Sequence, residues 1–334
     1  MGTRTVILGG GTGGVVAANV LRRSLPDEHQ VILISENAFH IYYGGLPFMA
    51  VGQRLPEAIT RPLAGLERKN IKFAQARIEA VDPDQSRVET SLGPIEYDYL
   101  VVSLGAEHHP ETVPGFVEGA MNYYSLDGAA QIWRNLRTFD RGRIVIFISS
   151  LPYICPPAPY ELTFLIDDLL RHRGVRHQVD LCLVTPEPYP ESLGGPSAGR
   201  PITDLLGDRG ITYRAGVRIL SLDPNQGVLH MDHNLTEEAD LFIGIPPNWG
   251  PGIFRGTEMA DPTGWIEVHP TTLATGYDNI WAVGDCTNIR VPVTGDFATK
   301  AGIMAHFQAE VVARNIAALI TKLRPRYRYR AKGG

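Results

Sequence analysis

Short apolar runs alternate with amphipathic helical stretches along the first part of the chain. The pattern predicts buried strands at Arg4–Leu8 and Gln30–Ser35, with a helix over Gly13–Leu25 between them. A strand, a loop, a helix and a second strand within about thirty residues form the usual order of a nucleotide-binding βαβ unit. Because such an alternation favours parallel strands, we expect an α/β protein.

The same order recurs in the middle of the chain. A strand over Arg143–Ser149 is followed by a helix near Tyr160–His172 and a strand over Val179–Val184. We therefore predict a second Rossmann-like dinucleotide-binding domain. The further elements that periodicity predicts are short antiparallel strands within Ile71–Val88, a return strand within Glu96–Leu104, strands at Ala239–Ile245 and Asn279–Val283, and a long helix over Lys300–Leu323.

Composition narrows the class of protein. The 334 residues are enough for two domains, and 44% hydrophobic and 20% charged residues are an ordinary globular balance. A net charge of −5 gives no reason to expect a nucleic-acid partner, and three cysteines cannot form a disulfide scaffold. No apolar run reaches the roughly eighteen residues of a membrane span. The first predicted strand begins close to Met1, which leaves no room for a signal peptide, so we expect a cytoplasmic protein.

A glycine-rich turn separates the first predicted strand from its helix. Its G-x-G-x-x-G spacing suits a tight turn whose backbone approaches a pyrophosphate, while the helix N-terminus offers N–H groups and a positive dipole. Glu36 ends the second strand, where a carboxylate can accept ribose hydroxyls. The turn residues expected to contact the dinucleotide are Gly9, Gly11, Thr12, Gly13 and Gly14.

Two later segments favour FAD over NAD as the occupant of this turn. An apolar strand within Thr275–Asp285 ends in Gly284-Asp285, and Tyr99–Gly105 is followed by Pro114-Gly115. In order and spacing these segments resemble the large flavoprotein family that contains glutathione reductase, type II NADH dehydrogenases and sulfide:quinone oxidoreductases. In that family a Gly-Asp of this kind directs its carboxylate to the ribityl or pyrophosphate part of FAD.

The resemblance covers nearly the whole chain and implies a split FAD domain with a second domain inserted. Residues 1–115 and 251–334 would bind FAD, and residues 116–250 would form the inserted domain. The other FAD contacts that it implies are Pro47, Ile78, Ser103, Leu104, Gly105, Gly284, Asp285, Lys300 and Gly302.

The inserted domain lacks the glycines of a second phosphate-binding turn. Its segment 149–160 reads SSLPYICPPAPY, and four prolines stand where NAD(P)H-using relatives carry G-x-G-x-x-G. Proline offers no N–H to a phosphate and fixes φ near about −65°. We therefore expect that NADH is not the electron donor.

Cys155 stands in this proline-rich segment, as part of CPPAPYE. The segment resembles the Cys-Pro-Pro-Gly-Pro-Tyr-Glu stretch of the flavoprotein subunit of flavocytochrome c sulfide dehydrogenase, and sulfide:quinone oxidoreductases place a redox cysteine at the equivalent point. The resemblance implies a sulfur-handling thiol at Cys155, with Glu161 taking a proton or tuning the thiol. In those relatives a partner cysteine lies further toward the C-terminus than Gly334, so either a truncated chain or a protein that uses one thiol is implied.

The start of the last predicted helix supports a flavin. Lys300-Ala301-Gly302 resembles the Pro-Lys-Ser-Gly helix start of flavocytochrome c, with Thr299 in place of the proline. Lys300 and the helix dipole would stabilise negative charge at N1 and O2 of reduced flavin. Cys182, within a strand, is expected to be inert, and Cys286 to lie near the ribityl or phosphate groups.

The remaining signals favour plain interpretations. His108-His109 and the pair His230 and His233 lack further ligands, so surface or turn positions are expected and no metal site. The basic tail Lys322–Lys332 alternates Tyr with Arg, as a half-exposed strand does, although it would also suit anionic lipid or an acidic partner. A coenzyme A disulfide reductase is disfavoured because Gly44 replaces that group's cysteine.

Together these observations predict an FAD-dependent oxidoreductase that oxidises sulfide or a related sulfur species through Cys155. Electrons would pass through FAD to a quinone or a c-type cytochrome. The alternatives are an NAD(P)H-dependent reductase of the type II NADH dehydrogenase kind and a non-catalytic flavin electron-relay subunit. We expect a homo-oligomer or a subunit of a complex, either cytoplasmic or held at the membrane periphery through its C-terminal region.

Overall fold

The computed structural model describes residues 2–292 and 294–330. The chain divides into two compact units. Unit 1 comprises Met1–Ile41, Thr60–Glu107 and Trp249–Gly334, and unit 2 comprises Tyr42–Ile59 and His108–Asn248. Compared with the expected boundaries, the segment 42–59 moves to unit 2, because its helix α2 (Leu46–Ala50) packs against helices α5 (Leu126–Leu136) and α6 (Ala158–His172).

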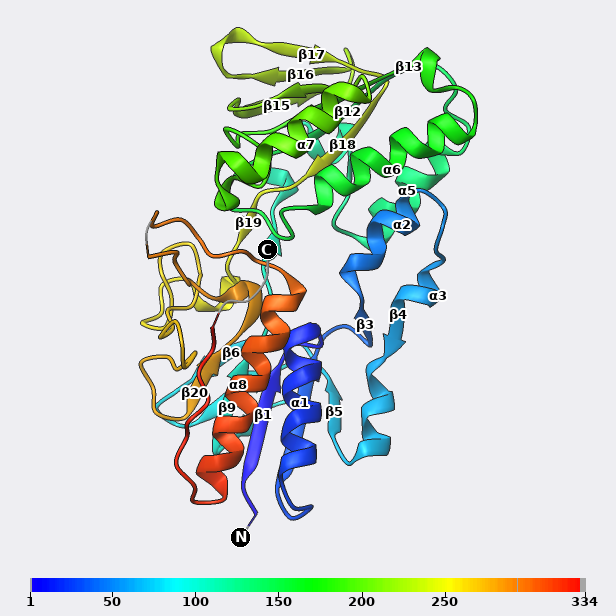
Figure 1. Cartoon of the computed structure of the whole chain (residues 1–334). Coiled ribbons are helices and arrows are strands. Elements are labelled where there is room, and N and C mark those ends of the chain that lie inside the picture. The colour runs from blue at the N-terminus through cyan, green and yellow to red at the C-terminus, as the bar shows by residue number, and fades with distance from the viewer. Residues whose placement is uncertain (1, 293, 331–334) are drawn as a thin grey trace. The chain divides into compact units, whose positions relative to one another are not determined.

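Unit 1 is built on a five-stranded sheet in the order β20-β9-β1-β2-β5, and every neighbouring pair is parallel. Ile7 belongs to one core cluster and Val6 and Leu8 to another, as expected for alternate residues of a buried strand. Helices α1 and α8 pack against each other on the Ile7 side (Figure 1). These elements are β1 (Arg4–Leu8), β2 (Gln30–Ser35), β5 (Lys72–Gln75), β9 (Tyr99–Val102), β20 (Ile280–Ala282), α1 (Thr12–Ser24) and α8 (Gly302–Ile320).

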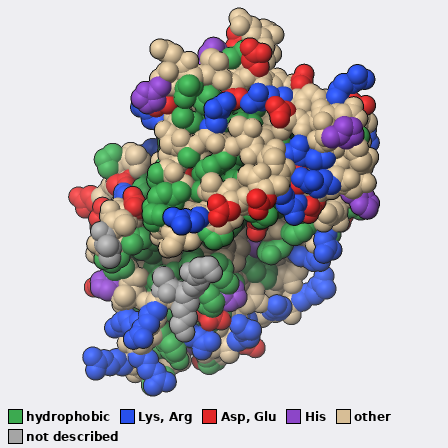
Figure 2. Space-filling model, turned by 45° about the horizontal axis from the view of Figure 1, so that its top comes forward, with side chains coloured by type: hydrophobic (Ala, Val, Ile, Leu, Met, Phe, Trp, Pro, Cys, Tyr) green, Lys and Arg blue, Asp and Glu red, His purple; other side chains and the backbone are tan. Residues whose placement is uncertain are grey.

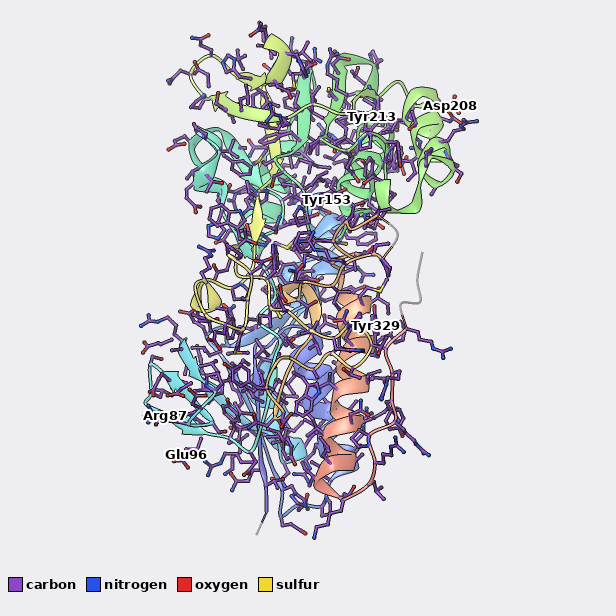
Figure 3. The ribbon with its side chains drawn as sticks, turned by 90° about the vertical axis from the view of Figure 1, so that its left-hand side faces the viewer. Arg87, Glu96, Tyr153, Asp208, Tyr213 and Tyr329 are labelled. Atoms are coloured by element: carbon purple, nitrogen blue, oxygen red, sulfur yellow. The ribbon has the colours of Figure 1, made fainter. Side chains whose placement is uncertain are left out.

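Smaller elements complete unit 1. The strands predicted within Ile71–Val88 are antiparallel only in part, because the first of them, β5, pairs in parallel with β2 and so extends the main sheet. The others form an antiparallel sheet of β6 (Ile78–Asp82), β7 (Arg87–Thr90) and β8 (Ile95–Glu96), with Arg87 opposite Glu96 (Figure 3). A second antiparallel pair is β3 (Phe39–Ile41) with β4 (Thr60–Pro62).

Unit 2 repeats this plan. Its five parallel strands have the order β11-β18-β12-β13-β14, and a three-stranded antiparallel sheet precedes the return strand β18. The strands are β11 (Ala120–Asn122), β12 (Gly142–Ile148), β13 (Val179–Val184), β14 (Thr212–Arg214), β15 (Ile219–Asp223), β16 (Val228–Met231), β17 (Thr236–Glu238) and β18 (Leu241–Ile245). The helices are α2 (Leu46–Ala50), α3 (Pro56–Ile59), α4 (Phe116–Gly119), α5 (Leu126–Leu136), α6 (Ala158–His172) and α7 (Pro196–Asp208). The short strands β10 (Glu107–His108) and β19 (Asn248–Trp249) pair with each other where the chain passes between the units. The predicted α/β class with two Rossmann-like folds is confirmed.

The basic tail lies along unit 1 as an extended segment. Over its described part it pairs with no other strand, so the prediction of a half-exposed strand is wrong. Tyr329 is buried beside α8 (Figure 3), and its N–H donates to the Thr271 carbonyl at 2.7 Å. Asn315 bonds both the N–H and the carbonyl of Tyr327. These isolated bonds anchor the tail without the regular ladder that defines a sheet. Lys332 lies outside the described residues.

Within the described ranges, none of the helices has both the length and the apolar character needed to cross a lipid bilayer. On the face drawn in Figure 2, Lys and Arg side chains form several separate groups with acidic side chains between them. The described part of the chain also brings no three His, Cys, Asp or Glu side chains together as metal ligands.

Candidate functional site

The turn between β1 and α1 has a backbone geometry that requires glycine. Gly9 has φ of +105°, and a Cβ there would lie 2.2 Å from the Ser103 carbonyl oxygen. A Cβ on Gly14 would lie 1.9 Å from the Gly9 carbonyl oxygen, whereas the Cβ position of Gly11 has no atom within 4 Å. The turn is therefore closed toward the protein and open at Gly11, beside an α1 N-terminus that has no side-chain cap and no acidic residue in its first turn. This geometry admits a phosphate to the helix N–H groups.

Several predicted contacts in unit 1 gather around this turn. A Cβ on Gly13 would lie 2.5 Å from the Ser103 hydroxyl oxygen, and one on Gly302 would lie 3.4 Å from the Thr12 hydroxyl oxygen. The glycine turn, the end of β9 and the start of α8 therefore meet. Glu36 follows β2 directly with an exposed side chain, as a group reaching for a ribose must have.

The turn after β20 carries a carboxyl oxygen without a partner. Gly284 has φ of +78°, and its N–H donates to the Gln308 side chain at 2.6 Å. The Asp285 Oδ1 atom is buried and accepts no hydrogen bond from the described residues. Burial raises the pKa of Asp285, and Lys300 opposes that rise. A buried polar atom left unpaired in a native fold points to a missing partner, such as a ligand hydroxyl.

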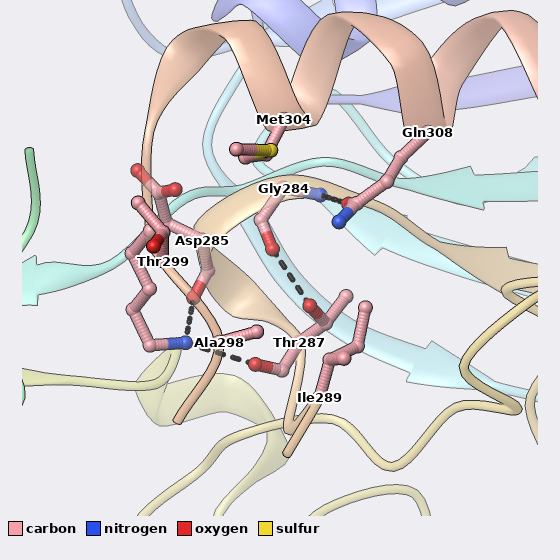
Figure 4. A pocket seen from close by; sticks show the side chains of 9 residues that line it. Gly284, Asp285, Thr287, Ile289, Ala298, Thr299, Met304 and Gln308 are labelled. Atoms are coloured by element: carbon pink, nitrogen blue, oxygen red, sulfur yellow. Dashed lines mark hydrogen bonds between the residues drawn. The ribbon is translucent and has the colours of Figure 1, made fainter. Parts of the chain in front are cut away.

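A small pocket opens beside this oxygen. Figure 4 shows Asp285, Thr299, Met304 and Gln308 around it. Its lining consists of Gly284, Asp285, Thr287, Ile289, Ala298, Thr299, Lys300, Met304 and Gln308. The lining comes from the turn after β20 and from the start of α8, which are the two segments that the sequence predicts to contact the ribityl and ring parts of FAD.

Lys300 is almost fully buried and is held from three sides. Its Nζ donates to the carbonyl oxygens of Asp285 and Thr287, both at 2.9 Å, as the dashed lines in Figure 4 mark. The same atom lies 3.8 Å from the ring centroid of Trp265 and 4.8 Å from that of Phe297. Burial lowers the pKa of Lys300 to about 8, against the raising effect of Asp285 and Cys286. Lys300 thus ties the 284–287 turn to the start of α8, and its contact with the flavin ring stays a prediction.

These observations in unit 1 fit a bound FAD. The open glycine turn suits its pyrophosphate, and the unpaired Asp285 oxygen suits a hydroxyl of its ribityl chain. Leu104 and Gly105 follow the end of β9. Leu104 is half-buried, and Gly105 has φ of +73° and open space at its Cβ position. Ile78 begins β6 and packs against the cluster on the other side of the sheet, and Pro47 is buried near the start of α2 in unit 2. The contacts of these last residues with FAD stay predictions.

The corresponding turn in unit 2 is built differently. In unit 1 only Gly9–Gly11 separate β1 from α1, whereas in unit 2 the segment Ser149–Pro157 separates β12 from α6. A long proline-containing loop cannot bring the α6 N–H groups to the end of β12 as a tight glycine turn does.

Cys155 occupies a strained position in this loop. Its φ of +49° is a left-handed conformation that non-glycine residues adopt at a cost, and its side chain is half-buried. Its carbonyl accepts the Ala158 N–H at 2.9 Å, so the residue immediately precedes the first turn of α6. Glu161 lies in that first turn and is exposed. Backbone strain of this kind recurs at functional sites, so it is consistent with a functional role for Cys155.

Beyond the ends of β12 and β13, buried side chains of the chain bond one another. Glu187, which follows β13, is 2% exposed, and its carboxylate accepts hydrogen bonds from the hydroxyls of Tyr153 and Tyr160. Tyr213 of β14 packs near Tyr160, with ring centroids 6.4 Å apart. Sequence reasoning missed this cluster, although the position of Glu187 after the second strand of the βαβ unit matches that of Glu36.

The other two cysteines are buried, and all three are outside disulfides. The Cys286 thiol donates to the carbonyls of Val102 and Val283, and burial raises its pKa to about 11. Burial likewise raises the pKa of Cys182. Both thiols are therefore poor nucleophiles.

The histidines differ in their surroundings. His108 was expected at a surface or turn, but it is half-buried in the short strand β10: its Nδ1 lies 2.8 Å from Asn248 Oδ1, and burial lowers its pKa. His109 pairs with Glu111. His230 is in β16, and His233 is exposed.

Comparisons with known proteins show the family of the chain. The model of the pyridine nucleotide-disulphide oxidoreductase family matches residues 3–309. A sulfide-quinone reductase from Aquifex aeolicus is 30% identical over 335 residues, covering 95% of this chain and 76% of that protein. The X-ray structure of the sulfide:quinone oxidoreductase from Aquifex aeolicus matches with a TM-score of 0.86 at 28% identity, covering 96% of this chain and 77% of that one. A type II NADH:quinone oxidoreductase from Staphylococcus aureus is 23% identical, covering 95% of this chain and 82% of that protein.

Two parallel sheets of the same plan and an open glycine turn followed by an acidic residue define a protein with two dinucleotide-type folds. The chain belongs to the pyridine nucleotide-disulphide oxidoreductase family. It is an FAD-dependent oxidoreductase.

Proposed function

We propose that the protein oxidises sulfide and delivers the electrons to a quinone. The observation that carries the proposal is the strained Cys155 in a glycine-free loop, at the place where a second dinucleotide would otherwise bind. The names of the relatives from Aquifex aeolicus point to the same pair of substrates.

The proposed reaction balances at a single thiol. One hydrosulfide ion and the Cys155 thiol form a persulfide, with release of one proton and two electrons. The quinone takes up two electrons and two protons and becomes a quinol. Bound FAD supplies the two-electron redox chemistry between these half-reactions.

The proposal assigns one role to each of the site residues. The Cys155 thiolate is the nucleophilic sulfur, and exposed Glu161 in the first turn of α6 exchanges the proton. The Gly9–Gly14 turn and Asp285 bind the cofactor, and Lys300 keeps the turn of Asp285 in place. By this assignment unit 1 is the FAD domain and unit 2 is the domain of sulfur chemistry.

A quinone is preferred over a c-type cytochrome as acceptor, because the relatives of both kinds carry quinone in their names. The type II NADH:quinone oxidoreductase alternative is disfavoured by the proline-rich loop and by the two tyrosines whose hydroxyls bond Glu187. A bound NADH would need the carboxylate that those tyrosines already bond.

Anaerobic stopped-flow mixing tests this choice of donor. The FAD-loaded protein is mixed with sulfide or with NADH while the flavin absorbance near 450 nm is followed, on the order of milliseconds to seconds as for typical turnover rates. We expect bleaching by sulfide and almost none by NADH. Rapid stoichiometric bleaching by NADH alone would replace the proposal with the dehydrogenase alternative.

A further inference from the structure

Glu187 is a buried carboxylate that bonds the loop of Cys155 on both sides of the cysteine. Its Oε2 atom accepts a hydrogen bond from the Tyr153 hydroxyl at 2.8 Å and another from the Tyr160 hydroxyl at 2.7 Å. Tyr153 precedes Cys155 in the loop, and Tyr160 follows it in the first turn of α6. One carboxylate oxygen therefore joins the two ends of the segment that carries the thiol.

Further bonds fix the same segment. The Tyr153 hydroxyl lies 3.1 Å from the carbonyl oxygen of Pro156, directly after Cys155. The Tyr124 hydroxyl bonds the Ile154 carbonyl and lies 3.4 Å from the Cys155 carbonyl. The left-handed φ of Cys155 is thus held by hydrogen bonds on both sides, which is how a costly conformation persists in a fold.

Glu187 is itself held firmly. Its Oε1 atom accepts from the Ser192 N–H at 3.2 Å and from the Ser192 hydroxyl at 3.1 Å, and its own N–H donates to the Thr185 hydroxyl at 3.1 Å. Burial, with the nearby Glu187 charge, raises the pKa of both Tyr153 and Tyr160, so their hydroxyls remain protonated donors. The groups that bond the carboxylate oxygens, from Tyr153, Tyr160 and Ser192, are all donors, so an acceptor fits there.

The position of Glu187 explains why an acid stands there. It follows the second strand of its βαβ unit, as Glu36 does in unit 1, and an acidic residue at that position binds ribose hydroxyls in a dinucleotide domain. In unit 2 the hydroxyls that it binds belong to two tyrosines of the same chain. Glu187 therefore accepts hydrogen bonds from tyrosine hydroxyls at a position where the acid of a dinucleotide domain accepts them from ribose hydroxyls.

We propose that Glu187 is a positioning residue for Cys155, a ribose-type acceptor that now holds the thiol-bearing loop through Tyr153 and Tyr160. The inference rests on the proposed role of Cys155 in sulfur chemistry. It extends that role by naming the group that presents the thiol.

The test compares Glu187→Gln and Tyr153→Phe with a matched control, Tyr189→Phe, in the FAD-loaded protein. The rate of alkylation of Cys155 by iodoacetamide is measured between pH 6 and 9 by mass spectrometry of the Cys155 peptide. Because the loop loses its tie, we expect alkylation at pH 7 to accelerate by about threefold or more in both variants, while flavin reduction by sulfide slows by a similar factor. The midpoint of the alkylation pH profile should also move, and the control should match the wild type.

The alkylation rate and the melting temperature together show whether Glu187 positions Cys155 or only stabilises the fold. If Glu187→Gln and Tyr153→Phe lower the melting temperature but leave the alkylation rate and its pH profile unchanged, the proposal is overturned. If Glu187→Gln does not fold, Tyr153→Phe decides alone, since phenylalanine preserves the packing. If Cys155→Ser proves as active with sulfide as the wild type, the proposed function fails, yet the alkylation data still decide whether Glu187 positions the loop.

Discussion

At the scale of single residues, the most informative groups are polar atoms whose burial is unexplained by the protein alone. The Asp285 Oδ1 atom in unit 1 and the Glu191 Oε1 atom in unit 2 are buried and lack hydrogen-bond partners among the described residues. An unsatisfied buried oxygen costs stability in the isolated chain. We interpret the first as a cofactor contact and the second as a group that exchanges a proton near neutral pH.

Substituting Asp285 with alanine should separate the stability of the apoprotein from cofactor affinity. Asp285→Ala removes a carboxyl whose Oδ1 atom is buried without a hydrogen-bond partner among the described residues, so the apoprotein should melt at the same or a higher temperature. Affinity for FAD should fall by about 1–3 kcal/mol, the cost of losing a hydrogen bond to a charged group. Fluorescence titration of the apoprotein with FAD measures it. The control is Asp278→Ala, an exposed residue before β20, and equal affinities for the two variants would refute the contact.

Glu191 should make the stability of unit 2 depend on pH. Burial, followed by the charges of Glu187 and Glu161, raises the pKa of Glu191 from its usual 4.5 to about 7. Between these two values the folded state holds a proton that the unfolded chain releases, so this contribution to stability is lost as pH rises from about 4.5 to 7. Glu191→Gln should therefore raise the melting temperature at pH 8 and leave it nearly unchanged at pH 5. The same shift at both pH values would contradict this assignment.

At the scale of elements, α6 is joined to its neighbours by a buried aspartate. Asp167 accepts hydrogen bonds from Arg171 of α6, Arg176 before β13 and Arg209 at the end of α7. Burial alone would raise the pKa of Asp167, but the three guanidinium groups together lower it. The stabilisation is therefore present above the usual pKa and is lost as pH falls through the lowered value.

Neutralising this aspartate should destabilise unit 2. Asp167→Asn leaves the arginines without their charge partner, and we expect a loss of about 3–5 kcal/mol in the free energy of unfolding. Urea denaturation followed by circular dichroism measures the change. The adjacent Asp168 pairs with Arg209 but is 61% exposed, so Asp168→Asn should cost less than about 1 kcal/mol. Comparable losses in the two variants would show that burial does not decide the energetics here.

The elements that sequence periodicity predicts best are the buried parallel strands. Arg4–Leu8, Gln30–Ser35 and Val179–Val184 are confirmed with the predicted bounds, because each is a mainly apolar run whose residues are mostly buried. The helix predicted over Lys300–Leu323 is real but shorter, since its first residues bind the turn of Asp285. The tail fails as a strand because alternation predicts burial, and Tyr329 is indeed buried, but alternation cannot supply a pairing partner.

The part of the site that the sequence alone predicts is the part marked by the spacing of glycines. The Gly9–Gly14 turn is marked by geometry that other residues cannot adopt, so the sequence alone indicates it. The tie between Glu187 and the Cys155 loop depends on Tyr153 and Tyr160, whose hydroxyls meet only after folding. Long-range side-chain bonds of this kind leave no spacing signal along the chain.

At the scale of the whole chain, one architectural plan occurs twice with different contents. Both units combine a five-stranded parallel sheet with a three-stranded antiparallel sheet. Unit 1 keeps the short glycine turn, and unit 2 replaces it with the longer loop of Cys155. The central claim of the proposed function is that unit 2, which has a dinucleotide-type fold, uses this loop for thiol chemistry.

The most direct test of that claim is the rate of flavin reduction by sulfide in Cys155→Ser, measured anaerobically against the wild type. Serine is nearly isosteric, so the variant should fold and retain FAD while losing the nucleophilic sulfur. Cys182→Ser serves as the control, because that buried thiol lies within β13 and its raised pKa makes it unreactive. We predict that fast flavin reduction disappears in Cys155→Ser and persists in the control. Equal rates in Cys155→Ser and the wild type would contradict the account and leave Cys155 without a part in sulfide oxidation.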